Sequence, residues 1–305
     1  MRKTGTSLFV TADEMRLPSR SRRAFLATLG GTIGLLAAPR IARGRASEPL
    51  SFGLTPVFLS SDLELLERLS AYLSDATGSP VRLVTRRTYQ EITALVVSGQ
   101  VDAAWICGYP YVQYRDALSL VAVPLWQGKP LYRSYIIVGR DRAGDDWEVT
   151  KGDIHAFSDP DSNSGYLTTT ALLAEDSLRS DGFFSSTFFT YGHRNVVRAV
   201  ASGLAQSGSV DGYVWEVMQE IEPALTDRTR VLRKSEWLGF PPVACASHAA
   251  SSPRTKALGA ALLDMHRDPE GKQVLELLRL DGFAPAQPEM FDRIAAKVSL
   301  LGRMG

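Results

Sequence analysis

Short apolar runs alternate with helical patterns along the chain from residue 47 onward. A short apolar run predicts a buried strand, whereas apolar positions that recur every three to four residues predict an amphipathic helix. In the first half of this region the pattern predicts strands at 51–55, 81–85, 101–107 and 118–126. Alternation of this kind is typical of an α/β fold built on a parallel sheet.

Two capping boxes predict where helices begin in this first unit. Ser61 with Glu64, and Thr88 with Glu91, have the spacing at which a hydroxyl and a carboxylate each accept a hydrogen bond from the other residue's backbone N–H. Gly99 is placed to end the second of these helices. Each predicted helix therefore starts shortly after a predicted strand ends.

The same alternation restarts in the second half of the chain. It predicts an extended segment at 132–139, strands at 154–158, 187–191 and 210–214, helices from about 163 and 194, a return path through 231–234 and 242–247, and helices at 253–266, 268–279 and 287–300. Two units joined by two extended crossings predict a two-lobed α/β fold, each lobe a mostly parallel sheet flanked by helices. We assign 47–133 with 243–305 to lobe 1 and 134–242 to lobe 2.

The first 46 residues differ from the rest in charge and pattern. They hold nine of the 34 basic residues and two of the 33 acidic ones. The segment Ser21 to Leu26 (SRRAFL) matches the twin-arginine export pattern, and the apolar stretch at 25–38 is too short and too rich in glycine to span a membrane. Small residues at Gly44 and Ala46 provide a cleavage site. We therefore expect a signal peptide at 1–46 and export to the periplasm; the alternative is an amphipathic surface helix.

The remaining chain is acidic, with 25 basic against 31 acidic residues, a net of about −6. Such a body lacks the positive surplus that nucleic-acid binding requires, so any anion site must be local. Beyond residue 46 no apolar run is long enough to span a bilayer. The composition therefore predicts a mature protein with no membrane span and no nucleic-acid partner.

Motifs for catalysis and for cofactor binding are missing from the sequence. The four histidines lack metal-ligand spacing, and there is no G-x-S-x-G, P-loop or G-x-G-x-x-G segment. Two cysteines, Cys107 and Cys245, do not make a disulfide framework. We therefore expect a binding protein without cofactor or metal rather than an enzyme.

The segment 158–167 (SDPDSNSGYL) opens the helix predicted from about residue 163. A helix start leaves about four backbone N–H groups unpaired, and the helix dipole adds roughly half a positive charge there. Ser162 and Ser164 add hydroxyl donors, and Gly165 lets a ligand approach the backbone closely. The segment is thus either an ordinary helix cap in a polar turn or a site for an anion.

Several segments occur in an order that matches one family. They are Gly99 to Asp102 (GQVD), Cys107 to Tyr111 (CGYPY), Asp159 to Tyr166 (DPDSNSGY), Tyr191 to His193 (YGH) and Ser209 to Gly212 (SVDG). In this order they resemble the phosphate/phosphonate family of ABC-transporter solute-binding proteins, which have the type II periplasmic binding fold. The resemblance implies a periplasmic protein, expected to be a monomer, that captures a small oxyanion between its lobes and delivers it to a membrane permease.

The resemblance also implies roles for individual residues. A tetrahedral oxyanion would be held by Ser162, Asn163, Ser164 and Gly165, with His193 donating from the facing turn and Tyr111, with Tyr109, closing the site from lobe 1. Asp211 or Glu216 would receive the ammonium group of an aminoalkyl ligand. The family's usual S-T-S is S-N-S here, which replaces one hydroxyl donor by an amide and leaves the identity of the oxyanion open.

Each of these residues also has a purely structural interpretation. His193 fits the first turn of a helix, Tyr109 and Tyr111 fit the packing of lobe 1, and Asp211 fits a helix cap. Trp215 is placed equally well for the core and for the wall of the site. These alternatives stay open at the level of the sequence.

Cys107 stands at the carboxyl end of a predicted central strand and has three interpretations. It is a small buried apolar side chain, a partner of Cys245 in a disulfide, or a soft ligand. The disulfide requires the return strand that carries Cys245 to lie beside the third strand of lobe 1. The soft ligand leads to an alternative function, in which the protein senses arsenite through Cys107 and signals to a sensor histidine kinase.

Overall fold

The structure is a computed structural model of the chain, and it describes residues 48–56 and 63–303. The predicted signal peptide at 1–46 and Ser61 of the first capping box lie outside the described residues. Within the described part, no helix combines the length and the apolar character needed to cross a membrane. The described residues form one compact unit.

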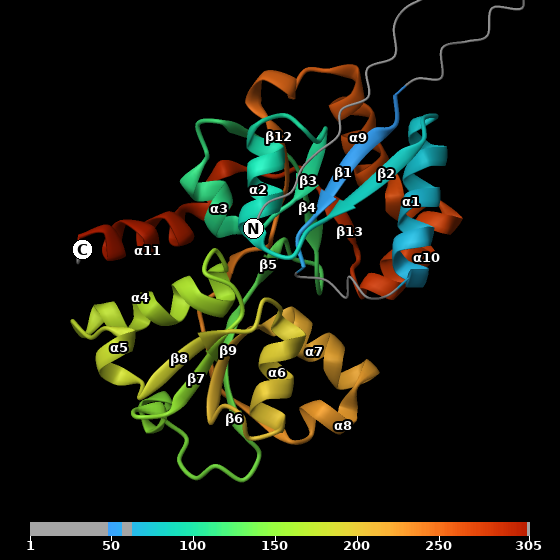
Figure 1. Cartoon of the computed structure of the whole chain (residues 1–305). Coiled ribbons are helices and arrows are strands. Elements are labelled where there is room, and N and C mark those ends of the chain that lie inside the picture. Colours follow the sequence, from blue (N-terminus) through green and yellow to red (C-terminus); the bar gives the residue numbers. More distant parts are fainter. Residues whose placement is uncertain (1–47, 57–62, 304–305) are drawn as a thin grey trace, which may run out of the picture. The chain divides into compact units, whose positions relative to one another are not determined.

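Lobe 1 is built around a six-stranded sheet (Figure 1). Its strands are β1 (Leu50–Leu54), β2 (Val81–Thr85), β3 (Ala103–Trp105), β4 (Leu118–Leu125), β12 (Val243–Ala246) and β13 (Gly282–Ala284), in the order β13-β4-β12-β3-β1-β2. β1 runs parallel to β2 and β3, whereas β12 runs antiparallel to both β3 and β4. The return strand therefore lies beside β3, which is the neighbour that the disulfide interpretation of Cys107 required.

The helices of lobe 1 are amphipathic, and their apolar faces make its core. They are α1 (Leu63–Thr77), α2 (Tyr89–Val97), α3 (Gly108–Gln113), α9 (Pro253–Asp264), α10 (Pro269–Leu278) and α11 (Asp292–Gly302). The second predicted capping box is confirmed, because Thr88 and Glu91 satisfy each other's backbone N–H groups at the start of α2. Phe52, Trp105 and Ile106 are fully buried in this core.

Lobe 2 is built around a five-stranded sheet with the order β10-β6-β9-β7-β8. Its strands are β6 (Ser134–Gly139), β7 (Ile154–Phe157), β8 (Ser186–Phe189), β9 (Ser207–Asp211) and β10 (Thr229–Lys234). β7, β8 and β9 are parallel, whereas β6 runs antiparallel to β9 and β10. Both sheets are therefore mixed, because β12 and β13 in lobe 1 and β6 in lobe 2 run against the other strands of their sheet.

The helices of lobe 2 start mainly at the carboxyl ends of its parallel strands. A π-helical turn at Asn163–Leu167 continues into α4 (Thr168–Glu175), and the others are α5 (Ser180–Phe183), α6 (His193–Ala201), α7 (Gly212–Ile221) and α8 (Pro223–Thr226). An aromatic cluster that includes Phe157, Phe183 and Phe184 lies in the core of this lobe.

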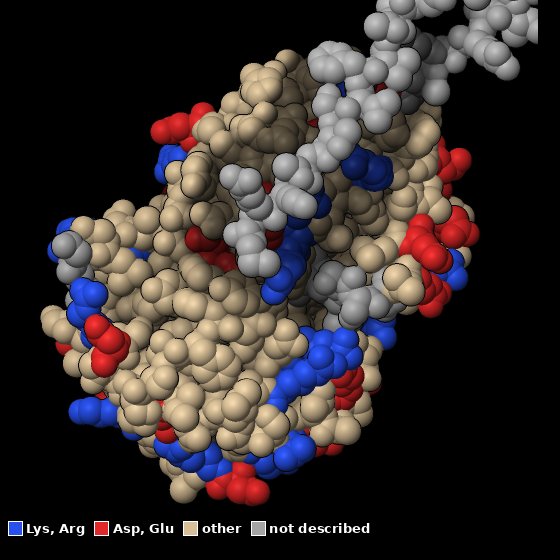
Figure 2. All heavy atoms as spheres, viewed as in Figure 1, with Lys and Arg blue, Asp and Glu red and all other residues tan. Residues whose placement is uncertain are grey.

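Two crossings join the lobes, and we call them the hinge. β5 (Leu131–Tyr132) pairs with β11 (Leu238–Gly239), and Ser134 and Ser235 exchange hydrogen bonds beside that pair. The C-terminal helix α11 contacts α3 in lobe 1 and α4 in lobe 2 (Figure 1). On the face shown in Figure 2, basic and acidic side chains are interspersed, without a broad basic field.

Several predicted strands have different bounds in the structure, and two of these differences have a local cause. The strand expected at 210–214 is β9 at 207–211, because Asp211 ends it by capping α7: its carboxylate accepts the N–H groups of Tyr213 and Val214 at 2.9 and 3.4 Å. The strand expected at 101–107 shortens to β3, because α3 begins at Gly108. The short helices α3 and α8, the helix α7 and the strand β13 were not predicted.

Candidate functional site

Polar and ionisable residues from both lobes meet where the parallel strands end. Cys107 follows β3, Ser158 follows β7, and His193 begins α6 after β8. Tyr89 begins α2 after β2, and Ser164 lies in the π-helical turn. We call these five residues the interlobe cluster; all five are buried.

Backbone N–H groups of the predicted anion-binding turn already have partners. Ser162 caps the turn, since its Oγ accepts the N–H of Gly165 at 3.0 Å. The N–H of Asn163 donates to the Cys107 sulfur at 3.2 Å, and its side-chain amide donates to Tyr132 Oη at 2.7 Å. The turn is therefore fixed both to lobe 1 and to the hinge.

Two serine hydroxyls in this region have no partner. In the described part of the chain, neither Ser158 Oγ nor Ser164 Oγ has a hydrogen-bond partner in favourable geometry, although both residues are at most 1% exposed and the Tyr132 hydroxyl lies near Ser164. A buried hydroxyl without a partner costs about 1–3 kcal/mol, so these two are the donors that a ligand would satisfy. Ser164 was predicted and Ser158 was not.

Gly165 brings Ser158 and His193 together. A Cβ placed on Gly165 would lie 1.8 Å from Ser158 Oγ and 3.0 Å from His193 Cε1. Since atoms cannot approach to 1.8 Å without bonding, no residue with a side chain fits here unless Ser158 moves. The glycine thus allows the hydroxyl, the turn and the imidazole to occupy one small region.

His193 is a neutral imidazole with one defined tautomer. Its Nδ1 accepts the backbone N–H of Asp211 at 3.1 Å, so the ring proton resides on Nε2, 3.2 Å from Tyr89 Oη. Complete burial lowers the pKa of His193 to about 3. His193 therefore acts as a hydrogen-bond donor through Nε2 rather than as a cation.

Tyr89 is the site residue that the sequence analysis missed. It is fully buried in lobe 1, its hydroxyl faces His193 of lobe 2, and its backbone N–H donates to the Asp159 carboxylate at 3.3 Å. Burial, followed by nearby acidic groups, raises its pKa well above the ordinary value, so the phenol stays protonated. The Thr88–Glu91 capping box places residue 89 directly after the end of a predicted strand. This is the sequence signal that could have identified Tyr89 as a site residue.

Asp211 is occupied by its role as a helix cap. It is buried, and burial raises its pKa to about 7 despite the two backbone N–H groups it accepts. Glu216, the other carboxylate considered for an ammonium group, is bound by the Tyr135 hydroxyl and lies 3.5 Å from Lys234 Nζ. Both carboxylates therefore already have partners within the chain.

The two tyrosines predicted to close the site lie in different surroundings. Tyr111 is buried and packs its ring on Phe291, with 4.8 Å between centroids. Tyr109 is partly buried, and burial and the Asp161 carboxylate raise its pKa. Tyr109 is thus near the 159–166 segment, whereas Tyr111 belongs to the packing of lobe 1.

Cys107 and Cys245 are both free and buried, so the disulfide left open as one interpretation of Cys107 is not formed. β12 does lie beside β3, but antiparallel pairing sets Val243 opposite Trp105 and Ala244 opposite Ala104. Cys245 therefore lies toward one end of β3 and Cys107 beyond the other, about four residue steps or ~13 Å apart.

The Cys107 thiol is also a poor candidate for a soft-ligand site. Burial raises its pKa to about 12, so it stays protonated, and its sulfur accepts the Asn163 N–H. Among the described residues, no three histidine, cysteine or acidic side chains gather as a metal site would require. The structure thus gives the arsenite alternative no support.

A family model for the periplasmic substrate-binding protein of phosphonate ABC transporters matches residues 52–291. The chain belongs to this family. The predicted resemblance is therefore confirmed, and so is the expectation of a binding protein rather than an enzyme, because the family consists of substrate-binding proteins.

Known proteins similar to this chain agree with the family. The "Phosphate-import protein PhnD" of Mycolicibacterium smegmatis is 29% identical over 178 residues, which cover 53% of the chain and 54% of that protein. The chain thus matches about half the length of this relative.

Two solved structures share its fold. One is a binding protein component of an ABC phosphonate transporter from Pseudomonas aeruginosa, with a TM-score of 0.77, 21% identity and coverage of 84% of this chain and 88% of that one. The other is PhnD1 from Prochlorococcus marinus in complex with methylphosphonate, with a TM-score of 0.73, 18% identity and coverage of 83% and 98%. These likenesses confirm the two-lobed periplasmic binding protein fold.

Proposed function

We propose that this chain binds a small phosphorus oxyanion of the phosphonate, phosphate or phosphite class at the interlobe cluster. The observation that carries the proposal is the pair of buried, unpartnered hydroxyls of Ser158 and Ser164 at the start of a helix. Supporting it are the family match and the "Phosphate-import" and methylphosphonate descriptions of the related proteins.

The donors gathered around the cluster are neutral, which suits an anion that must also be released. Ser158 and Ser164 supply O–H groups, His193 supplies Nε2–H, and Tyr89 supplies its phenol. Hydrogen bonds to a charged acceptor are worth about 1.5–3 kcal/mol each, and the helix dipole adds to them. Several such bonds hold an oxyanion without a buried lysine or arginine.

Closure of the lobes accompanies binding in this proposal. Tyr89 of lobe 1 forms hydrogen bonds with His193 and Asp159 of lobe 2, and Cys107 of lobe 1 accepts one from Asn163 of lobe 2. Hydrogen bonds therefore already join the two lobes at the cluster. A ligand that adds hydrogen bonds from both sides favours this closed arrangement over an open one.

For the cellular role, we propose the transport function of the family together with an export route and an oligomeric state. The protein delivers its ligand to the membrane permease of an ABC transporter from the periplasm, after export by the twin-arginine segment at 1–46, and acts as a monomer. We propose 47–133 with 243–305 as lobe 1 and 134–242 as lobe 2.

Isothermal titration calorimetry with phosphate, phosphite and methylphosphonate tests the site. Ser164→Ala and Ser158→Ala should each weaken binding by about 10- to 100-fold, because each removes a donor to a charged acceptor. Ser299→Ala, at an exposed position on α11, is the matched control and should change nothing. Unchanged affinity in both site variants would place the ligand elsewhere.

A further inference from the structure

The first hinge crossing is hydrogen-bonded to the π-helical turn through two side chains. Ser134, at the start of β6, donates from its Oγ to the backbone carbonyl oxygen of Ser164 at 2.6 Å. Tyr132, two residues earlier, accepts the side-chain amide of Asn163 on its Oη at 2.7 Å. The crossing that joins the lobes therefore holds two consecutive residues of the turn, and the second of them carries one of the buried hydroxyls proposed for the ligand.

The alternation of side chains along an extended chain explains why both residues reach the turn. Side chains at positions i and i+2 of an extended segment point to the same face, and the residue between them points to the other. Tyr132 and Ser134 are buried against the turn, whereas Arg133 lies over the Trp237 ring, 4.4 Å from its centroid. The crossing thus presents one face to the ligand site and the other to a residue of the second crossing.

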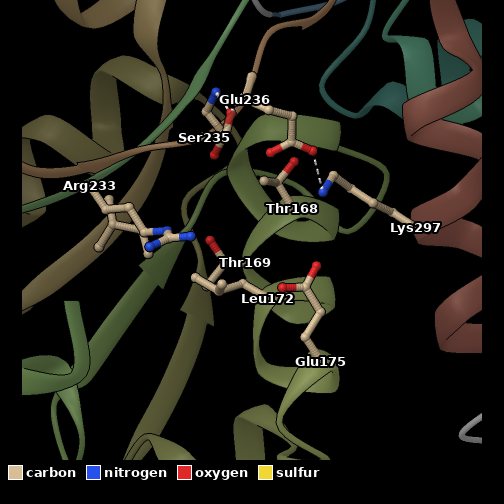
Figure 3. Close-up of a pocket in the computed structure, with 10 residues that line it drawn as sticks. Thr168, Thr169, Leu172, Glu175, Arg233, Ser235, Glu236 and Lys297 are labelled. Carbon is tan, nitrogen blue, oxygen red and sulfur yellow. Dashed lines mark hydrogen bonds and ion pairs between the residues drawn. The ribbon is translucent and has the colours of Figure 1, made fainter. Parts of the chain in front are cut away.

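Ser134 is itself fixed to the second crossing. Its N–H donates to Ser235 Oγ at 2.9 Å, and its carbonyl oxygen accepts the N–H of Ser235 at 2.8 Å. Figure 3 shows the continuation of this crossing, where Glu236 follows Ser235 and is bound by Lys297 of α11 at 2.7 Å. The hydroxyl that reaches Ser164 is therefore anchored by both crossings, and the second crossing is anchored by the C-terminal helix.

The backbone of the turn gives the bond from Ser134 its importance. The hydrogen bonds of the turn span five residues, as from the N–H of Leu167 to the carbonyl oxygen of Ser162 at 2.9 Å. Such π-helical turns are rare and frequently occur at functional sites. The carbonyl carbon of Ser164 is bonded to the Cα that carries its side chain. A hydrogen bond to that carbonyl therefore also restricts the direction of Ser164 Oγ.

We propose that Ser134 is a positioning residue for the binding of a phosphorus oxyanion. By holding the carbonyl group of Ser164, it keeps the Ser164 hydroxyl directed at the ligand and ties that hydroxyl to the hinge. The inference rests on the proposed function of the interlobe cluster. Because Ser134 acts through Ser164 rather than on the ligand, its effect on affinity depends on the presence of the Ser164 hydroxyl.

A double-mutant cycle, measured by isothermal titration calorimetry with phosphate and methylphosphonate, tests this dependence. Ser134→Ala should weaken binding by about three- to tenfold in the otherwise unaltered chain, which corresponds to the loss of one hydrogen bond between neutral groups. In a chain that already carries Ser164→Ala, the same change should weaken binding by less than about twofold, because the hydroxyl to be positioned is missing.

Two further variants separate positioning from a general loss of stability. Ser70→Ala in α1 is the matched control, because Ser70 Oγ donates to the carbonyl oxygen of Val81 at 2.8 Å within lobe 1, and the change removes the same kind of bond outside the interlobe cluster. It should leave phosphate affinity within about twofold. Ser134→Thr keeps the hydroxyl, and the cavity of about 60 Å³ that Ser134 lines has room for the added methyl group. This variant should bind phosphate more tightly than Ser134→Ala.

The outcomes distinguish a failure of this inference from a failure of the proposed function. If Ser164→Ala weakens binding but Ser134→Ala weakens it by less than about threefold, the positioning role is overturned and the anion site stands. An equal loss from Ser134→Ala with and without the Ser164 hydroxyl overturns the role as well, and so does Ser134→Thr binding no tighter than Ser134→Ala. If Ser164→Ala binds as tightly as the unaltered chain, the anion site and the positioning role both fail.

Discussion

Gly165 shows how little room the interlobe cluster leaves at the level of single residues. The virtual Cβ position at Gly165 is taken by the Ser158 hydroxyl, and its backbone does not have a left-handed φ. The glycine is therefore required by packing rather than by backbone conformation. This distinction predicts which second change could restore a substituted protein.

Gly165→Ala should destabilise the protein by about 1–3 kcal/mol, the usual cost of forcing an extra methyl group into a packed region. Urea unfolding measures it. The matched control is Gly182→Ala in α5, where a Cβ meets no atom within 4 Å and the cost should be near zero. Adding Ser158→Gly to Gly165→Ala should recover part of the lost free energy of unfolding, because it removes the hydroxyl that the new methyl group meets. If the effects of the two changes simply add, the predicted contact between residues 158 and 165 is contradicted.

Tyr89→Phe tests the residue that the structure adds to the site. The change removes one hydroxyl that faces His193 Nε2 across the lobes. We expect phosphate affinity to fall by about tenfold or more, the loss of one hydrogen bond to a charged acceptor. Tyr114→Phe, at a tyrosine that is 47% exposed, is the control. Equal affinities in the two variants would remove Tyr89 from the site.

At the scale of elements, the register between β3 and β12 determines the state of the cysteines. Because the strands are antiparallel, Cys107 and Cys245 diverge along the sheet instead of meeting. We expect two reactive thiols per chain after unfolding under oxidising conditions, measured by thiol titration with a chromogenic disulfide. A reducing agent should leave the midpoint of thermal unfolding unchanged. A titration that finds no free thiol would mean that the two cysteines are paired, which would contradict this register.

Local patterns allowed the elements themselves to be predicted, and the reasons are specific. β1, β2 and β7 lie within a residue or so of their predicted bounds, since each is a short apolar run with clear limits, and Thr88 with Glu91 fixed the start of α2. The predicted end of β9 was wrong by three residues, because Asp211 both ends the strand and caps α7. In the sequence, a single polar residue in an apolar run does not show whether it continues the strand or caps the following helix.

The candidate site was only partly predictable, for a different reason. Ser164, Gly165 and His193 belong to segments with a recognisable order, and the structure brings them together. Ser158 joins them by packing against Gly165 within lobe 2. Tyr89 joins them by a contact between the lobes, and its capping box does not show which side chain it meets there. Tyr111 fits the pattern as well as Tyr109, and only the packing on Phe291 separates them.

At the scale of the whole molecule, three buried ionisable groups predict how stability depends on pH. Burial lowers the pKa of His155 and His193 from 6.5 to about 3, and it raises the pKa of Asp211 from 3.8 to about 7. Between about pH 4 and 6.5 the unfolded chain binds two protons at the histidines that the folded chain does not. The folded chain keeps one proton at Asp211 that the unfolded chain loses.

The net difference of one proton means that these groups make stability rise with pH in this window, by about 1.4 kcal/mol per pH unit. Urea unfolding at several pH values measures the slope. His155→Gln removes one histidine and should lower the slope by about 1.4 kcal/mol per pH unit, independently of any change in stability itself. His266→Gln, at an exposed histidine, is the control. An unchanged slope in His155→Gln would contradict the assignment.

The strand order of lobe 1 has a consequence for how the chain is made. β12 separates β3 from β4, so the sheet that starts at Leu50 stays divided until Val243–Ala246 leaves the ribosome. All five strands of lobe 2 lie within 134–234 and emerge earlier. During synthesis the second lobe can therefore fold first, while the first lobe waits with the facing edges of β3 and β4 open. The lobe that begins the protein is the last to be completed.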